Sequence, residues 1–387
     1  LSQSLVVLRR DSQQLFVLNS TSRFIWDAIQ AGNTATEIAL RLSTSFAVSL
    51  EQAQADVDQT LAQWQQTMLA PPSTDECSNT ALSQQPEIGM DGPLGQPIHV
   101  CHYQLAGKCF AVRVYDHGIL ELLTPILAGL VCDQPLADVC CFDIFKQDGR
   151  WVLQCDKQSS AQHADPAVVA LYLRQAVMER VQQGSDRLAI LHAAGVSASG
   201  RCIVMPAPGG SGKSTLCAAL VAAGMDCVGD DILPLLDNGQ VVPVPASIGL
   251  KQGSWAIVGQ YFPQLESSPV YASGSARIRF LVNSNPNPDR RADLPASLPV
   301  HCLLFPSYQA GAATTLARIT PEESLALIIE SNTHLSRPIQ AAKVAGLIAW
   351  VESTPAFSMT FSQLPEAVAQ VQALFNTEPD HESLAAL

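Results

Sequence analysis

The chain has few charged residues and an unequal balance of the two signs. Asp, Glu, Lys and Arg make up only 15% of its 387 residues, with 22 basic side chains against 35 acidic ones and a formal net charge of −13. Because non-specific binding to nucleic acids needs a surplus of basic charge, this composition argues against a nucleic-acid partner. It does not indicate disorder, since 47% of the residues are hydrophobic and can form a substantial core. The length suggests about two or three domains.

Paired cysteine motifs and long apolar runs are also missing. The 11 cysteines are odd in number, no two have CxxC spacing, and the neighbours Cys140 and Cys141 cannot close an ordinary disulfide. The sequence therefore signals neither a zinc site nor a disulfide framework, and free thiols in a reducing cytoplasm are the simpler interpretation. No stretch is long enough for a membrane span, and the first apolar run is too short and interrupted for a signal peptide. We expect a soluble, cytoplasmic protein with no membrane partner.

The first part of the chain has the pattern of a small separate unit. Two short β-type runs, 5–8 and 15–18, flank a polar segment typical of a hairpin turn. Three segments with apolar residues at helical spacing follow, and Asn19 and Thr34 are placed to cap the first two helices. We expect a β-hairpin and three helices over 1–72.

The remaining chain divides by composition into four parts. Pro, Ser, Gln and Gly dominate 73–97, as in flexible linkers. Strand-like runs and one long helix occupy 98–184, and strands alternate with helices over 185–376. The polar residues 377–387 predict a loose tail. The alternation indicates an α/β fold.

The segment 207–215, APGGSGKST, fits the template of a nucleotide-phosphate-binding loop (P-loop), with Ala207 in place of the first glycine. It lies between a predicted strand, 202–205, and a predicted helix, 213–223, as the template requires. Its glycines let successive backbone N–H groups converge on phosphate oxygens, at a helix N-terminus that attracts anions. A glycine-rich turn that merely begins a helix is the alternative.

The same template names the contacts of the nucleotide. The expected binding residues are Pro208, Gly209, Gly210, Ser211, Gly212, Lys213, Ser214 and Thr215. Lys213 would contact the β- and γ-phosphates of ATP, and the Ser214 hydroxyl would bind Mg²⁺.

Three polar residues near predicted strand ends are candidates for catalysis. Asp230 and Asp231 follow the strand predicted over 225–228, where one carboxylate can hold Mg²⁺ while the other takes a proton from an attacking hydroxyl. The alternative for this pair is a turn or strand cap. His192 ends the strand predicted over 188–192, and the carboxyl ends of parallel strands face the ligand. A structural histidine is the alternative.

Two basic residues are candidates for contacts with phosphate or with the acceptor. Lys251 lies in the sequence GLKQGSW, and Arg337 precedes a proline in a predicted loop from which a catalytic arginine could project. For both, a solvated surface charge is the alternative.

Residues 191–235 resemble the HPr serine kinase/phosphorylase family, and more closely its HPr-kinase-related branch in peptide biosynthesis clusters. The shared pattern is a histidine before the loop, a short hairpin, the loop itself and two aspartates shortly after it. The resemblance implies a P-loop kinase domain similar in fold to phosphoenolpyruvate carboxykinase, which uses ATP and Mg²⁺ to phosphorylate a serine hydroxyl.

The resemblance also implies roles for the catalytic residues, which would be Lys213, His192, Asp230 and Asp231. Asp230 would be the general base, Asp231 would support Mg²⁺ or the acceptor, and His192 would sit at the γ-phosphate. The roles of the two aspartates can be exchanged. Thr215 stands where the bifunctional members usually have an acidic residue, and their second glycine-rich signature is missing. These departures argue against HPr as the substrate and against reverse phosphorolysis. The resemblance is compatible with a homo-oligomer.

The N-terminal unit resembles the small PqqD-type peptide chaperone, on the segment LFVLNSTSRFIWDAIQAGNTATEIALRLSTSF and the helix after it. This resemblance implies a winged-helix-like fold that binds the leader of a ribosomally made precursor peptide along a strand edge. An unrelated winged-helix domain packed on the kinase is the alternative. Together the two resemblances predict a peptide kinase whose N-terminal domain recruits its substrate. A nucleotide-switched peptide chaperone and a small-molecule kinase remain as other hypotheses.

Overall fold

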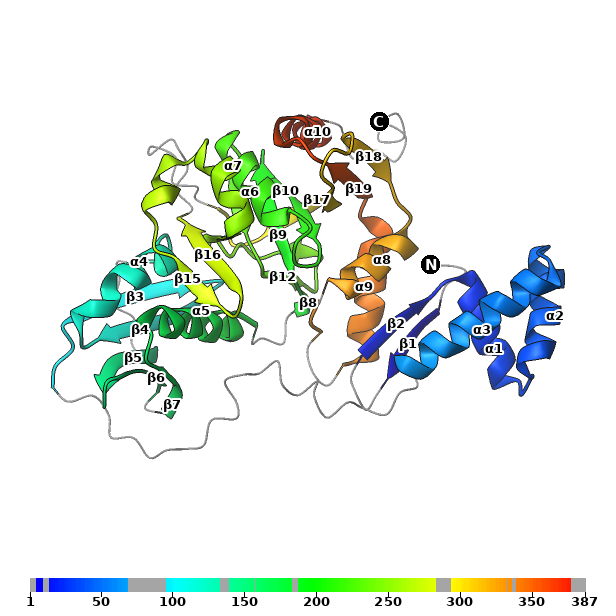
Figure 1. The fold of residues 1–387 in the computed structure, drawn as a ribbon, viewed down its shortest axis with the longest axis horizontal. Helices are drawn as coiled ribbons and strands as arrows, with labels where there is room; N and C mark the ends of the chain where they lie inside the picture. The colour runs from blue at the N-terminus through cyan, green and yellow to red at the C-terminus, as the bar shows by residue number, and fades with distance from the viewer. Residues whose placement is uncertain are drawn as a thin grey trace.

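The computed structural model describes residues 5–9, 14–68, 95–132, 139–156, 158–182, 187–282, 294–331, 333–335 and 339–376. Three predictions fall outside the described residues: the tail 377–387, the residue Arg337 and nearly all of the linker 73–97. The described chain has a mixed α/β structure, with four sheets and with helices between and around them (Figure 1).

A β-hairpin and three helices form the N-terminal unit, as predicted. Its elements are β1 (Leu5–Arg9), β2 (Gln14–Leu18), α1 (Ser20–Gln30), α2 (Ala35–Phe46) and α3 (Leu50–Gln66). Asn19 caps α1, and Thr34 caps α2 in a capping box with Glu37. The apolar faces of the helices meet around fully buried side chains such as Ile25 and Val57.

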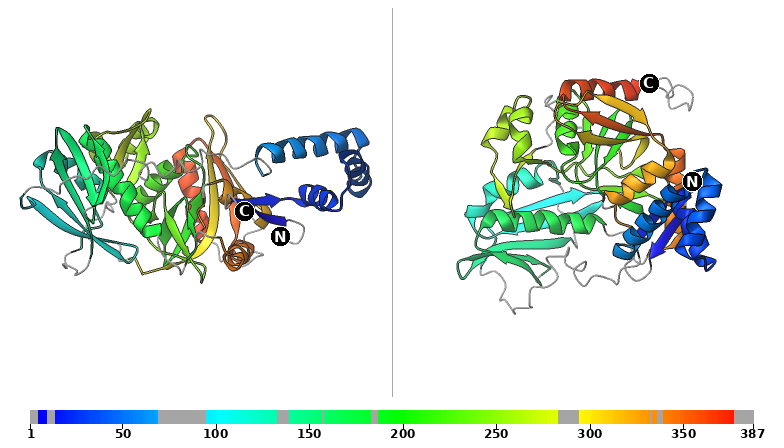
Figure 2. Two further views of the ribbon diagram at one scale, coloured as in Figure 1. Left: turned by 90° about the horizontal axis from the view of Figure 1, so that it is seen from below. Right: turned by 45° about the vertical axis from the view of Figure 1, so that its right-hand side comes forward.

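The hairpin also contacts the rest of the chain. Val6 and Val17 pack against the apolar cluster to which Leu325 and Ile328 of α8 (Pro321–Glu330) belong. Figure 1 shows the hairpin beside α8, while α1, α2 and α3 extend away from the remainder of the molecule, as Figure 2 also shows. The N-terminal unit is therefore joined to the rest of the structure through its sheet and not through its helices.

The second unit is a five-stranded sheet with helices on one face. Its elements are β3 (His99–Leu105), β4 (Lys108–Val114), η2 (His117–Ile119), α4 (Leu120–Leu127), β5 (Cys140–Gln147), β6 (Arg150–Cys155), β7 (Gln158–His163) and α5 (Pro166–Gln182). Neighbouring strands are antiparallel except for the parallel pair β4 and β5. The sequence predicted four of these strands and α5, but it missed β7, which is polar, and α4, which contains Pro125.

The third unit is a nine-stranded sheet in which β10, β17 and β19 run parallel. Its strands are β8 (Arg187–Leu191), β9 (Ala193–Ala198), β10 (Arg201–Pro206), β11 (Asp226–Gly229), β12 (Leu233–Leu236), β13 (Gln240–Val241), β17 (Leu298–Tyr308), β18 (Thr315–Arg318) and β19 (Ala356–Phe361). The helices α6 (Lys213–Ala222) and α10 (Leu364–Asn376) belong to one apolar cluster with the sheet, and α8 and α9 (Ala341–Ser353) belong to another.

A small three-stranded sheet lies against α5. Its strands are β14 (Ile248–Lys251), β15 (Tyr271–Ser273) and β16 (Ala276–Leu281). Between β14 and β15 the chain forms the short helices η3 (Gln252–Ser254), α7 (Trp255–Gly259) and η4 (Pro263–Ser267). Helix α5 is thus packed between this sheet and the five-stranded one (Figure 1). The sequence indicated only short segments here.

The strand before the P-loop strand differs from the prediction. The predicted strand 188–192 ends one residue earlier as β8, and a further strand, β9, follows and pairs antiparallel with β10. Strand β9 has the sequence AAGVSA, and its small residues gave no strand signal. A side chain at Gly195 would come within 2.8 Å of Leu233 Cδ1, so close packing requires the small residue there.

Candidate functional site

The segment 207–215 forms the loop between β10 and α6 and the start of α6, and it borders a cavity of about 720 Å³. Gly210 and Gly212 have φ values of +96° and +90°, which favour glycine. A Cβ on Gly212 would lie 3.0 Å from Phe361 Cζ and 3.1 Å from Tyr308 Cβ. Most of the predicted binding residues line the cavity: Gly209, Gly210, Gly212, Lys213, Ser214 and Thr215. Pro208 and Ser211 are not among its lining residues.

The substitution Gly212→Ala tests the loop conformation. We expect a loss of about 1–2 kcal/mol from the left-handed backbone conformation, with a further loss from the contacts with β17 and β19. The matched control is Gly209→Ala, because Gly209 is outside the left-handed region and its added Cβ would meet only Lys251 Nζ, at 3.8 Å. Thermal denaturation of both variants without ligand measures the difference. Equal stability of the two variants would contradict this description of the loop.

Lys213 begins α6, and its side chain points to His192. Lys213 is 6% exposed, and its Nζ lies 3.2 Å from His192 Nε2. The pKa of His192 is lowered, first by burial and then by the charge of Lys213, so the neutral imidazole accepts a hydrogen bond from the ammonium group. Ammonium and imidazole are thus held together at the N-terminus of α6, where anions bind favourably.

The reason given for the position of His192 was wrong, although the residue lies at the loop. His192 stands between β8 and β9, and β9 is antiparallel to β10, not parallel. The start of β9 is therefore beside the end of β10, where Ala193 pairs with Pro206. An antiparallel hairpin, and not the common edge of parallel strands, brings the histidine to the loop.

The two adjacent aspartates have different environments. Asp230 is 1% exposed, and its carboxylate accepts hydrogen bonds from the Ser214 hydroxyl at 2.9 Å and from the Gly249 N–H at 3.1 Å. Asp231 has φ +78°, its side chain is 45% exposed, and it lines the cavity. A left-handed aspartate costs backbone energy, which is typical of functional positions. One carboxylate is therefore fixed beneath the loop, and the other faces the open space.

Arg174 is a site residue that the sequence analysis missed. It lies on α5, its Nη2 is 3.3 Å from Asp231 Oδ2, and its guanidinium group stacks 4.9 Å from the Phe280 ring centroid. Arg174 is 8% exposed, and its Nη1 is buried without a hydrogen-bond partner among the described residues. The signal that could have identified it is an arginine within a mostly apolar stretch of helix, AVVALYLRQAV.

Of the two basic residues predicted to contact phosphate or the acceptor, the structure describes only one. Lys251 ends β14, is exposed, and lines the cavity near the loop. Arg337 lies outside the described residues, so its role stays a prediction. Apolar side chains also line the same cavity, among them Ile257, Ile278 and Phe280. The lining of the cavity therefore combines polar and apolar groups.

Burial raises the pKa of Asp230 to about 7, and the charge of Asp231 adds to this effect. In the unfolded chain the group has an ordinary pKa near 3.8. The folded protein therefore binds the proton more readily, and the free energy of unfolding falls as pH rises from about 4 to about 7, by at most roughly 4 kcal/mol.

The variant Asp230→Asn should remove this pH dependence. We expect the melting temperature of wild type to fall relative to that of the variant as the pH rises from about 5 to about 8. Thermal denaturation in the presence of a chelator, without nucleotide, measures it. Asp237→Asn is the control, because Asp237 is paired with Lys343 away from the cavity. Parallel pH profiles of wild type and Asp230→Asn would contradict the assignment.

The groups around the loop suit a phosphate and a hard divalent cation. The backbone of the loop and the N-terminus of α6 can bind an anion, and Lys213 adds a positive charge. The buried Ser211 hydroxyl has no hydrogen-bond partner among the described residues. The contact between Ser214 and Asp230 places a hydroxyl and a carboxylate together, which is an oxygen ligand set that Mg²⁺ prefers.

Comparisons with known proteins bear on the N-terminal unit. Residues 4–69 match the family model described as Coenzyme PQQ synthesis protein D (PqqD), which confirms that this unit is PqqD-like. No curated protein matches the chain. The resemblance of residues 191–235 to HPr kinases stays a prediction. None of the helices in the described ranges has both the length and the apolar character that crossing a membrane requires.

Proposed function

We propose that the protein is an ATP-dependent, HPr-kinase-like phosphotransferase. It phosphorylates a serine hydroxyl of a ribosomally synthesised precursor peptide that the N-terminal domain recruits. The observation that carries this proposal is that the glycine-rich loop with Lys213 and the exposed carboxylate of Asp231 line one cavity. The buried carboxylate of Asp230 lies beneath the loop, where it accepts a hydrogen bond from Ser214.

The residues that would hold ATP and Mg²⁺ follow from this arrangement. The loop amides and Lys213 would bind the phosphates, and Ser214 with Asp230 would hold the cation. When bound, Mg²⁺ neutralises charge on the phosphate oxygens. Burial raises the pKa of Asp230, and a bound cation would oppose this effect by favouring the ionised carboxylate.

The general base is then Asp231, which exchanges the roles first implied by the resemblance. Geometry comes before pKa in choosing a base, and an acceptor hydroxyl in the cavity can reach Asp231 but not the buried Asp230. Arg174 orients the Asp231 carboxylate from one side. Asp231 would take the proton of the serine hydroxyl as the serine oxygen bonds to the γ-phosphorus and the bond from that phosphorus to the bridging oxygen breaks, which releases ADP. Neutral His192 hydrogen-bonds Lys213 at the phosphate end.

The PqqD-like unit supports a peptide as the acceptor. Such domains bind precursor peptides or partner enzymes in the pathways that modify ribosomal peptides, which supports a peptide as the acceptor. The hairpin packs against α8 of the nine-stranded sheet unit, so a peptide bound to the N-terminal unit is tethered to the candidate site. Tethering raises the effective concentration of the core peptide and lowers the need for contacts with its sequence.

The test uses the full-length protein with ATP, Mg²⁺ and candidate precursor peptides. We expect the precursor to gain the mass of one phosphate on a serine, detected by mass spectrometry. A separate leader peptide added in excess should slow this reaction by about tenfold or more, since tethering can enhance binding by about 10²-fold. A scrambled leader of the same composition is the control.

Two outcomes would contradict the proposal. Nucleotide-dependent peptide affinity without a phosphorylated product would indicate a nucleotide-switched chaperone. Equal rates for the precursor, its leaderless core and a free hydroxylated metabolite would indicate a small-molecule kinase whose N-terminal unit has another purpose.

A further inference from the structure

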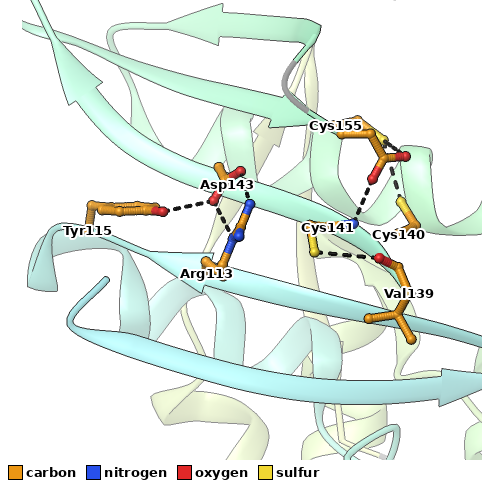
Figure 3. A network of polar contacts seen from close by, with 8 residues as sticks. Arg113, Tyr115, Val139, Cys140, Cys141, Asp143 and Cys155 are labelled. Carbon is orange, nitrogen blue, oxygen red and sulfur yellow. Dashed lines mark hydrogen bonds and ion pairs between the residues drawn. The ribbon is translucent and has the colours of Figure 1, made fainter. Parts of the chain in front are cut away.

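Two cysteines outside the candidate site face each other on the five-stranded sheet. Cys140 begins β5, and Cys155 ends the antiparallel neighbour β6, where it pairs in register with Phe142. Because side chains alternate between the faces of a strand, Cys140 and Cys155 lie on the same face, and Cys141 lies on the other. The sulfur atoms of Cys140 and Cys155 are 3.5 Å apart, and Figure 3 shows the two side chains pointing toward each other.

A guanidinium group from α5 completes the cluster. Arg180 Nη2 lies 2.7 Å from Cys155 Sγ and 3.2 Å from Asp156 Oδ2, and Arg180 also stacks over the Phe142 ring. The hydrogen bond from Cys140 and the positive charge of Arg180 lower the pKa of the Cys155 thiol against the opposing effect of burial. The pKa of Cys140 is raised, first by the same hydrogen bond. Arg180 donates a hydrogen bond to Cys155, so Cys155 is the sulfur of the pair that is favoured as the thiolate.

A second close pair provides an internal comparison. Cys217 and Cys227 have sulfur atoms 3.9 Å apart, but both side chains are buried, and the pKa of Cys217 is raised. Cys140 and Cys155 are only partly buried, so part of each residue is exposed to solvent. Proximity, access and a cationic neighbour occur together at Cys140 and Cys155, and these three properties are typical of reactive cysteines.

A metal site is the competing interpretation of the same atoms. The ligand atoms of Cys140, Cys155 and Asp156 lie within 4.8 Å of one another. Arg180, however, contacts two of these three ligands and places a positive charge where a cation would have to bind. The cluster therefore fits a stabilised thiolate better than a bound metal ion.

We propose that Cys140 and Cys155 form a redox-active dithiol that exchanges with low-molecular-weight disulfides such as oxidised glutathione. The Cys155 thiolate attacks one sulfur of the small disulfide, forming a mixed disulfide and releasing one small thiolate. The Cys140 thiol loses its proton and attacks Cys155 Sγ, which releases the second small thiolate. The protein dithiol is oxidised by two electrons to an intramolecular disulfide, and the small disulfide is reduced to two thiols.

The test equilibrates the full-length protein in buffers of reduced and oxidised glutathione, blocks the remaining thiols, and maps the products by mass spectrometry after trypsin digestion. We expect a cross-link between the peptide with Cys140 and the peptide with Cys155. Cys140→Ser and Cys155→Ser should each abolish it, and the matched control Cys141→Ser should keep it. A cross-link that survives Cys140→Ser, or a Cys155 no more reactive than Cys101, would overturn the proposal.

Alkylation kinetics test the role of the guanidinium group independently of the cross-link. We expect Arg180→Gln to slow iodoacetamide alkylation of Cys155 at neutral pH by about tenfold, which corresponds to about one pKa unit. The pH midpoint of alkylation should move upward, and Arg180→Lys should restore most of the rate. A rate that does not change in Arg180→Gln would overturn the proposal. So would tight, stoichiometric Zn²⁺ binding by the reduced protein that is lost in Cys155→Ser and prevents oxidation.

Discussion

Under the proposed function, we expect the replacement of Lys213 with alanine to lower kcat/KM for phosphorylation of the precursor peptide by about 10³-fold, because it removes a charge that the fold holds in place at the proposed phosphate site. Lys213 is 6% exposed, begins α6, and needs no reorientation to meet an anion at the loop. A preorganised charge of this kind stabilises the transition state more than a mobile surface charge does. The measurement is the steady-state rate of phosphopeptide formation at varied ATP, together with ATP affinity by calorimetry.

Lys251→Ala is the matched control for this prediction. Lys251 lines the same cavity but is exposed at the end of β14, so its charge is screened by solvent. We expect a loss of less than about tenfold. The melting temperatures of both variants should be compared with wild type, since Lys213 also contacts His192. A Lys213→Ala protein that is folded and retains activity similar to that of Lys251→Ala would show that the loop is not the phosphate site.

Local signals in the sequence were sufficient for the elements that carry the loop. Strand β10 and helix α6 follow from an apolar run, three glycines and a helical pattern, which are all short-range features. The capping residues Asn19 and Thr34 likewise identified helices in the N-terminal unit. These predictions succeeded because the interactions that specify each element lie within a few residues of one another.

The sequence could not predict contacts between distant segments. Tyr271 and Phe280 of the three-stranded sheet pack in the same apolar cluster as Phe142 and Leu173, and the Tyr271 hydroxyl donates to the Leu122 carbonyl at 2.6 Å. The five-stranded sheet and α5 therefore share a core with a segment far along the chain. No local pattern marks such a contact, because the partners are separated by about a hundred residues or more.

In the candidate site, too, some features follow from local sequence and others only from contacts between distant segments. The motif identified Lys213 and the two aspartates, but the positive φ of Asp231 and the burial of Asp230 arise from packing around the turn after β11. A Cβ at Gly229 would lie 2.8 Å from Leu233 Cδ2, so the chain passes closely beneath this turn. Arg174 reaches the site from α5, which is separated from the motif by the three strands β8, β9 and β10. The motif therefore identifies the types of residue in the candidate site, whereas tertiary packing determines how deeply each of them is buried.

Under the proposed function, we expect Asp231→Asn to lower kcat by about 10³-fold while ATP affinity stays within about threefold of wild type, because it removes the proposed base but leaves the proposed phosphate site intact. The Asp231 side chain faces the cavity and contacts Arg174, not the loop. Quenched-flow measurement of a single turnover, with ATP affinity measured in parallel, separates the chemical step from binding. Asp237→Asn is a surface control with no expected effect.

Asp230→Asn is the decisive comparison, because the same change is made one residue earlier in a buried position. Its carboxylate accepts hydrogen bonds from Ser214 and Gly249, so the amide should weaken binding of Mg²⁺ and raise the Mg²⁺ concentration needed for half-maximal rate. Excess Mg²⁺ should then restore part of the activity of Asp230→Asn and none of that of Asp231→Asn. If Mg²⁺ instead rescues Asp231→Asn, then Asp230 is the base, and the turn must open to expose it to the acceptor.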